Sequence, residues 1–165
     1  MKQVYPSEEF EQRELFRLLK VLTQVWPKFN LIIHIPNGGA GPLRGMAGRM
    51  KAMGTKAGVS DIFYPVARQG YHGCWIELKS RKPSARLSDD QRLWLVAMRY
   101  EGYYSIFCNG YKEALQAIIF YETGIDLSMT DIDYLPQMLF IKGKNSIQDL
   151  IKRHQVMQKC ENLSA

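Results

Sequence analysis

The segment that decides the fold is "GVSDIFYPVARQGYHGCWIELKS", residues 58–80. Two β-prone runs, "DIFYPVA" and "CWIELKS", flank "RQGYHG", whose glycines supply a turn, so the segment predicts a β-hairpin. Asp61 and Glu77 are equidistant from Gln69 and should face each other across the strands, with Cβ atoms about 4.5–5.5 Å apart. Lys79 lies two residues beyond Glu77 and shares its face. The hairpin therefore brings two carboxylates and a lysine to one place.

The other segments predict an α/β fold with a mixed central sheet flanked by helices on both faces. In chain order we expect an amphipathic helix between Ser7 and Pro27, a strand at 31–35, one basic helical stretch at 43–53, the hairpin, a helix at 89–101, a strand at 103–108 and a helix at 111–122. The passage from the hairpin through a helix to the next strand resembles a βαβ unit. We divide the chain into a core, residues 1–123, and a helical extension, residues 124–165.

Length and composition indicate one globular domain, since 165 residues with 46% hydrophobic content can bury a sizeable core. The three cysteines are widely spaced and form no CxxC pair, which argues against a zinc site or a disulfide framework. No signal peptide or membrane-spanning run is visible. These features favour a soluble cytoplasmic protein in a reducing compartment.

Positive charge is concentrated in the part of the chain that contains the hairpin. Residues 31–88 hold nine Lys or Arg and only two acids, Asp61 and Glu77, whereas the net charge of the whole chain is +6. A solvated basic face is one explanation. The other is a surface that binds a polyanion, with the embedded carboxylates holding a metal ion.

The two carboxylates of the hairpin raise an electrostatic question. Two like charges about 5 Å apart in a half-buried sheet cost several kcal/mol unless a cation neutralises them. Lys79 can supply one positive charge, and Mg²⁺ held by carboxylates and phosphate oxygens neutralises them better. Lys79 would then orient or help deprotonate an attacking water, which is the chemistry of phosphodiester hydrolysis. A structural Asp–Lys–Glu ion cluster fits the same spacing equally well.

These residues resemble a known family. "SDIFYPVARQGYHGCWIELK" is similar to the D-x(n)-E-x-K signature of PD-(D/E)xK nucleases, and "IPNGG", "KAGVSD", "HGCWIELK", "LSDDQ" and "GYKEALQAI" resemble the VRR-NUC group, especially its small stand-alone bacterial and phage members. The resemblance covers residues 7–122 and implies a restriction-endonuclease-like core. It implies that Asp61 and Glu77 bind Mg²⁺ or Mn²⁺, that the carbonyl of Leu78 is a backbone ligand, and that Lys79 is catalytic.

Two further site residues follow from the resemblance. "SEEFEQ" is similar to the family's N-terminal motif, which places Glu8 at the metal site directly or through water; the alternative is that it only complements the helix dipole. Gln91 matches a glutamine that follows the E-x-K motif, and the capping box that it forms with Ser88 is compatible with this role. The family usually has proline where this chain has Ser60. We interpret that difference as tolerated, because proline would only stiffen the chain there.

The sequence thus predicts a Mg²⁺- or Mn²⁺-dependent DNA endonuclease, with branched DNA or four-way junctions as candidate substrates. The candidate DNA contacts are Asn37, Arg44, Arg49, Lys51, Lys56, Arg81 and Lys82. His34 is more typical of a structural residue, although it lies close to the "IPNGG" motif. A nucleic-acid-binding module that is inactive alone and acts within a repair or replication complex is the rival hypothesis. A sequence-specific cutter would need a recognition element, for which the chain leaves little room.

The resemblance also implies a homodimer, because paired cuts in a two-fold junction need two active sites. The extension carries apolar residues that could form the dimer interface: Leu135, Met138, Leu139, Phe140, Ile141, Ile147, Leu150 and Ile151. The alternative is that these residues pack on the chain's own core.

Overall fold

A four-stranded mixed sheet lies at the centre of the molecule, in a computed structural model that describes residues 4–36 and 47–163. The strands are β1 (Ile33–His34), β2 (Ile62–Tyr64), β3 (Cys74–Lys79) and β4 (Tyr104–Asn109), in this order across the sheet. β2 pairs antiparallel with both β1 and β3, whereas β3 and β4 are parallel. The predicted α/β class with a mixed sheet is therefore confirmed.

The hairpin between β2 and β3 has the register that the sequence predicts. Ile62 pairs with Ile76 and Tyr64 with Cys74. The same register places the residue before Ile62 opposite the residue after Ile76. At the tip, Gln69 and Gly70 have φ angles of 51° and 84°. Positive φ at both central residues matches the twist of the two flanking strands, which is why such turns suit hairpins.

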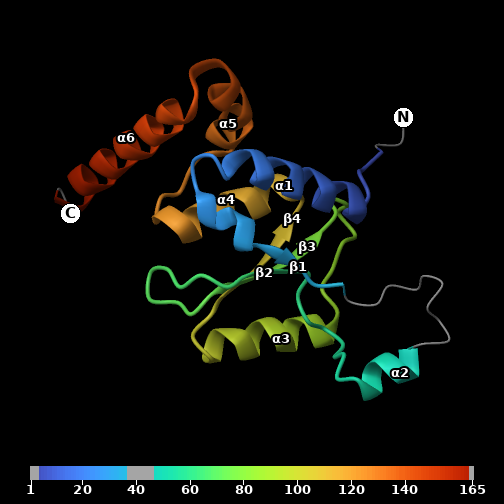
Figure 1. Ribbon diagram of the computed structural model, residues 1–165. Coiled ribbons are helices and arrows are strands. Elements are labelled where there is room, and N and C mark those ends of the chain that lie inside the picture. Colours follow the sequence, from blue (N-terminus) through green and yellow to red (C-terminus); the bar gives the residue numbers. More distant parts are fainter. Residues whose placement is uncertain (1–3, 37–46, 164–165) are drawn as a thin grey trace.

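Helices cover both faces of the sheet (Figure 1). α1 (Glu8–Leu22) and α4 (Tyr111–Thr123) lie on one face, and α3 (Asp89–Tyr100), which connects β3 to β4, lies on the other. α5 (Met129–Lys142) packs on α1 and α4, and α6 (Lys144–Leu163) follows it at the outside. The short α2 (Ala47–Ala52) lies apart from these layers.

The main core fills the space between the sheet and the α1/α4 layer. Ile76 and Leu78 of β3 are fully buried there, together with Leu15 of α1 and Ile118 of α4. Because side chains alternate along a strand, the odd-numbered residues of β3 point to the α3 face. Glu77 and Lys79 therefore share the face of α3, with Leu78 between them anchored in the core.

The C-terminal extension consists of α5 and α6, and its described apolar side chains pack mostly against the chain itself. Leu135 and Ile147 are fully buried in the core cluster, and Met138, Leu150 and Ile151 are partly buried against it. The side chains of Leu139, Phe140 and Ile141 lie outside the described residues. Val156 and Met157 of α6 remain exposed. Of the apolar residues expected at a dimer interface, those whose side chains are described thus pack in or against the core.

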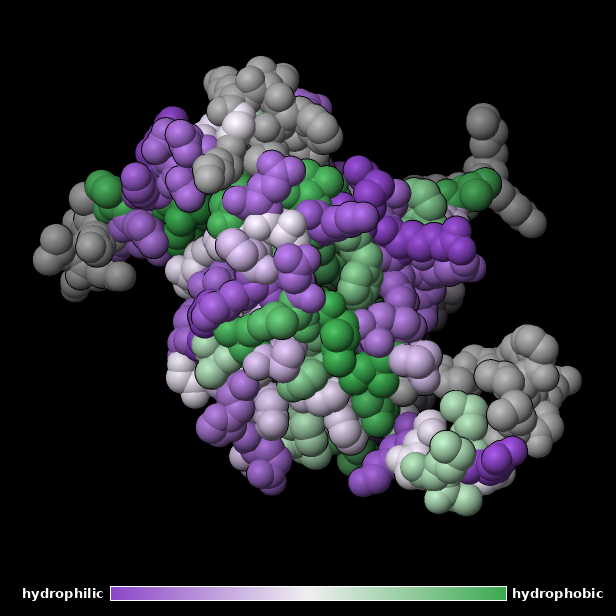
Figure 2. Space-filling model, in the orientation of Figure 1, coloured by the Kyte–Doolittle hydropathy of each residue, from purple (hydrophilic) through white to green (hydrophobic). Residues whose placement is uncertain are grey.

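The first edge of the sheet differs from the sequence expectation. Pro27 starts a 3₁₀-helix, η1 (Pro27–Leu31), so only Ile33 and His34 remain to form β1 instead of the predicted strand at 31–35. Proline suits the first position of a helix because it has no N–H to leave unpaired. Leu31 and Ile33 are half exposed, and Figure 2 shows a hydrophobic area over β1.

Helix α2 (Ala47–Ala52) lies within the expected basic helical stretch at 43–53, of which residues 43–46 lie outside the described residues. Within the same residues, no helix combines the length and apolar character that crossing a membrane requires.

Candidate active site

Asp61 lies just before β2, at the end of the hairpin that faces the start of α3. Its carboxylate oxygen Oδ2 accepts a hydrogen bond from the backbone N–H of Leu78 at 3.1 Å. Its own carbonyl accepts from the backbone N–H of Ile35 at 2.8 Å and lies 2.9 Å from Nδ1 of His34. The end of β1 thus fixes the main chain of Asp61. His34 has a positioning contact that its place in the sequence did not reveal.

Glu77 is a fully buried carboxylate on β3. One oxygen, Oε1, accepts hydrogen bonds from Lys79 Nζ at 2.8 Å and from Nε2 of Gln91. The other, Oε2, is buried and has no hydrogen-bond partner among the described residues. Burial raises the pKa of Glu77 to about 7, opposed by the hydrogen bond from Lys79 and assisted by the charge of Asp61. Within the described residues, the site therefore leaves one carboxylate oxygen of Glu77 without a donor.

Lys79 bridges two acids that come from distant parts of the chain. Besides its contact with Glu77, Nζ lies 3.5 Å from Oε1 of Glu8, at the start of α1. Burial lowers the pKa of Lys79, but the hydrogen bond to Glu77 and the charges of Glu8 and Asp61 outweigh it, so the pKa is raised. Lys79 is thus a cation at neutral pH. The structure brings Glu8 to the site, in contact with the lysine.

Gln91 combines the two roles that the sequence suggested for it. Its Oε1 accepts from the backbone N–H of Ser88 at 2.9 Å, and its backbone N–H donates to the Ser88 hydroxyl at 3.3 Å, which is the capping box of α3. Its Nε2 donates to Glu77. Gly58, with φ of 82°, packs so closely on Asp90 that a Cβ would lie 2.4 Å from that residue's carbonyl. The first turn of α3 is therefore fixed beside the site by the hydrogen bond from Gln91 to Glu77 and by the close packing of Gly58 on Asp90.

A second buried carboxylate, Glu11 of α1, was missed from the sequence. It is fully buried and accepts from Arg81 Nε at 2.8 Å and from the backbone N–H of Tyr111 at 3.1 Å. The signal was available, because Glu11 precedes Leu15, Leu18 and Leu22 by 4, 7 and 11 residues and so falls on the buried stripe of its helix. Arg81, expected to contact DNA, has this structural partner.

The other candidate DNA contacts that the structure describes lie on exposed segments. Arg49, Lys51 and Lys56 are exposed on α2 and the segment after it, and Lys82 is exposed after β3. Asn37 and Arg44 lie outside the described residues. A role for these residues in DNA binding remains a prediction.

The donor atoms at this site suit a hard divalent cation. Among residues 4–36 and 47–163, no three His, Cys, Asp or Glu side chains form a metal-binding group, so the side-chain donors are the two carboxylates. The carbonyl of Leu78 points to the same side of β3 as its N–H, which meets Asp61, and can add a third oxygen. Carboxylate and carbonyl oxygens are typical ligands of Mg²⁺ and Mn²⁺. The unpaired Oε2 of Glu77 fits such an ion.

The chain is similar to known proteins in sequence and in fold. A family model described as the VRR-NUC domain matches residues 16–112, which include Asp61, Glu77, Lys79 and Gln91 but not Glu8. A solved structure described as "VRR_NUC domain protein" is 24% identical, with a TM-score of 0.57, and the match covers 72% of this chain and 89% of that chain. This second likeness shows the fold alone. No curated protein matches the chain.

Proposed function

The chain belongs to the VRR-NUC domain family, and from this premise we propose that it is a metal-dependent DNA endonuclease that hydrolyses phosphodiester bonds. The family supports a nuclease-type function. The single observation that carries the proposal further is the buried Oε2 of Glu77, a carboxylate oxygen without a partner among the described residues, on the same face as Asp61 and Lys79. A buried carboxylate oxygen that receives no hydrogen bond is costly in a structure that needs only stability.

We propose that Asp61, Glu77 and the carbonyl of Leu78 hold Mg²⁺ or Mn²⁺. When bound, the ion would stabilise negative charge on the scissile phosphate as a Lewis acid. The chain prepares the ligands: the N–H of Leu78 orients the Asp61 carboxylate, and Gln91 and Lys79 hold one oxygen of Glu77 so that the other stays free. The protein would thus contribute ligands that are already oriented before the ion binds.

Lys79 supplies the positive charge nearest to these ligands. Because its pKa is raised, the ammonium is protonated at neutral pH and its N–H groups can donate to an attacking water or to a phosphate oxygen. Glu8 and Glu77 hold the ammonium from two sides, which limits where it can point. We therefore assign Lys79 to orienting the nucleophile and Glu8 to positioning Lys79.

The experiment that tests this function uses the purified chain with linear, flapped and four-way-junction DNA, each in Mg²⁺, Mn²⁺ or EDTA. We expect cleavage with either ion and none in EDTA. Lys79→Ala and Asp61→Ala should both abolish cleavage, but calorimetry should show that only Asp61→Ala loses Mn²⁺ binding. Unchanged Mn²⁺ binding in Asp61→Ala would refute the coordination. DNA binding without cleavage under all conditions would favour a binding module that acts within a larger complex.

Branched DNA as the preferred substrate and a homodimer as the active form are the finer parts of the proposal. Their support is the family and four exposed apolar side chains of the extension, Met129, Tyr134, Val156 and Met157. Light scattering at micromolar concentration tests the dimer, and a monomer mass would refute it. Equal rates on linear and four-way-junction DNA would refute junction selectivity.

A further inference from the structure

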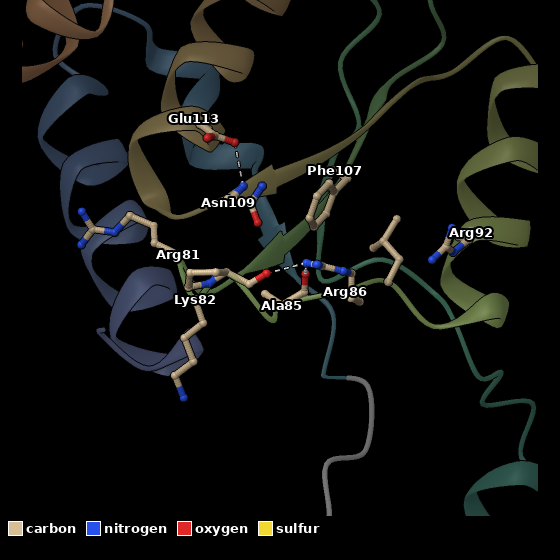
Figure 3. A pocket seen from close by; sticks show the side chains of 10 residues that line it. Arg81, Lys82, Ala85, Arg86, Arg92, Phe107, Asn109 and Glu113 are labelled. Atoms are coloured by element: carbon tan, nitrogen blue, oxygen red, sulfur yellow. Dashed lines mark hydrogen bonds between the residues drawn. The ribbon is translucent and has the colours of Figure 1, made fainter. Parts of the chain in front are cut away.

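A basic groove lies at the C-terminal end of β4, outside the carboxylate site. It has a volume of about 610 Å³ and lies between the segment that follows β3, the end of β4 and the first turns of α3 (Figure 3). The residues that matter for its chemistry are Arg81, Lys82, Arg86, Arg92, Phe107 and Asn109. Arg86, Arg92 and Phe107 belong to none of the roles assigned above.

The groove adjoins the candidate active site through the parallel pairing of β3 and β4. Phe107 is the partner of Glu77 in the register, and Asn109 is the partner of Lys79. Paired residues on neighbouring parallel strands point to the same face, and the strands lie about 4.8 Å apart. A DNA strand that passes the carboxylates can therefore continue into the groove within one nucleotide.

The charges in the groove favour a phosphate. Arg86 donates through Nη1 to the carbonyls of Pro83 and Ala85, at 2.6 and 2.8 Å, and these neutral acceptors fix the guanidinium without cancelling its charge. Arg92 is exposed and lies 4.0 Å from the fully solvated carboxylate of Asp89. The one acid among the lining residues, Glu113, is engaged by the backbone N–H of Asn109 at 2.8 Å.

The apolar element of the groove is the ring of Phe107. In Figure 3 this ring lies above Arg86 and to the left of the helix that carries Arg92. The ring is only partly buried, and no other aromatic ring among the described residues stacks on it. Cations beside a partly accessible aromatic ring are a combination that can bind single-stranded nucleic acid, because every base has a face that can stack. The volume suits a small ligand such as one nucleotide rather than a double helix.

We propose that this groove binds an unpaired nucleotide of the DNA strand next to the scissile phosphate, with its base on Phe107 and its phosphate held by Arg86 and Arg92. The inference rests on the proposed function, since it takes DNA as the substrate. It adds the requirement that the substrate has unpaired nucleotides beside the cut. A duplex with a single-stranded tail should satisfy this requirement, and a blunt duplex should not.

The test measures binding in EDTA, where no cleavage occurs, by fluorescence anisotropy of a blunt duplex and of the same duplex with a six-thymidine tail. The unmodified protein should bind the tailed duplex more tightly, by roughly fivefold or more if one base stacks. Phe107→Leu should lose this preference without weaker binding of the blunt duplex, and Phe107→Trp should keep it. Tyr100→Leu, which removes an exposed aromatic side chain elsewhere on α3, is the matched control.

Arg92→Ala gives an independent readout at an exposed position where folding is not at risk. The salt dependence of tailed-duplex binding should flatten by roughly 0.7 in log–log slope for one lost phosphate contact on a single strand. Arg153→Ala on α6 makes the same change in net charge and should leave the slope unchanged. If Phe107→Leu does not fold, Arg92→Ala alone decides.

The outcomes separate the two proposals. If the tail preference depends on Phe107 and no DNA is cleaved in any metal, the groove stands and the nuclease proposal falls. If DNA is cleaved but Phe107→Leu and Arg92→Ala bind the tailed duplex like the unmodified protein, the groove inference is overturned.

Discussion

Glu11 and Glu77 are both fully buried carboxylates, but their surroundings differ. Both oxygens of Glu11 are engaged, one by Arg81 and the other by the N–H of Tyr111. Glu77 uses one oxygen for Lys79 and Gln91 and leaves the other without a partner among the described residues. The comparison teaches that burial alone does not mark a functional acid. What distinguishes Glu77, the acid proposed to bind the metal, is the carboxylate oxygen that has no hydrogen bond among the described residues.

The largest difference between the two glutamates should appear in catalysis. Glu77→Gln should reduce cleavage by more than roughly 100-fold, since loss of a ligand should exceed the 10–100-fold cost of losing a residue that only supports a ligand. Its unfolding free energy without metal should change little, because removing a desolvated charge offsets the loss of the ion pair with Lys79, which keeps Glu8 as a partner. Cleavage kinetics and urea denaturation measure both. Strong destabilisation by Glu77→Gln would show that this acid is also structural.

The next effect concerns stability at Glu11. Glu11→Gln should lower the unfolding free energy by about 2 kcal/mol, because it leaves Arg81 without its charged partner. The loss should not be larger, because the guanidinium can still reach solvent. Urea denaturation of the single variants and of Glu11→Gln with Arg81→Met measures the coupling. A loss below about 0.5 kcal/mol would remove the distinction between the two acids.

Two glycines allow the surroundings of Glu77 and Glu11 to be compared at the backbone. Gly58→Ala would force a Cβ to within 2.4 Å of Asp90 beside the Glu77 site, and we expect roughly tenfold slower cleavage because Asp61 and α3 shift apart. Gly110→Ala would press on Arg81, with Cγ at 2.6 Å, and should lower stability, with little change in metal binding.

Gly54→Ala is the control for strain alone, since Gly54 has φ of 96° and no atom near the added Cβ. A Gly58→Ala protein that cleaves DNA as fast as the Gly54→Ala protein would contradict the close packing at the site. Melting temperatures of all three variants separate strain from misplacement.

The smallest expected effect is on thermal stability. Mg²⁺ at ten times its dissociation constant should stabilise the protein by about 1.4 kcal/mol, or roughly 3–6 °C for a chain of this length. Glu11→Gln should retain this shift and Glu77→Gln should lose it. A thermal melt with and without Mg²⁺ measures it, and an equal shift in both variants would place the ion elsewhere.

Local sequence signals account for much of the fold and for part of the site. The hairpin register follows from the symmetric spacing of strands about one turn, and the start of α3 follows from Ser88 and Gln91, three residues apart. Local patterns could not pair Glu11 with Arg81, because the two are 70 residues apart and meet only when α1 packs beside β3. The position of Phe107 beside Glu77 likewise depends on a parallel register that no local pattern encodes.

The two contacts of Gln91 limit which amino acids can occupy its position in the first turn of α3. A capping box accepts either glutamate or glutamine at this position, and both can receive the N–H of Ser88. Glutamate would turn a second carboxylate toward the buried oxygen of Glu77, whereas the amide of glutamine offers that oxygen a donor. The choice between two nearly isosteric residues is thus made by the neighbouring acid. A substitution that preserves the helix can still disturb the surroundings of Glu77, so helix propensity alone would misjudge this position in any redesign of the chain.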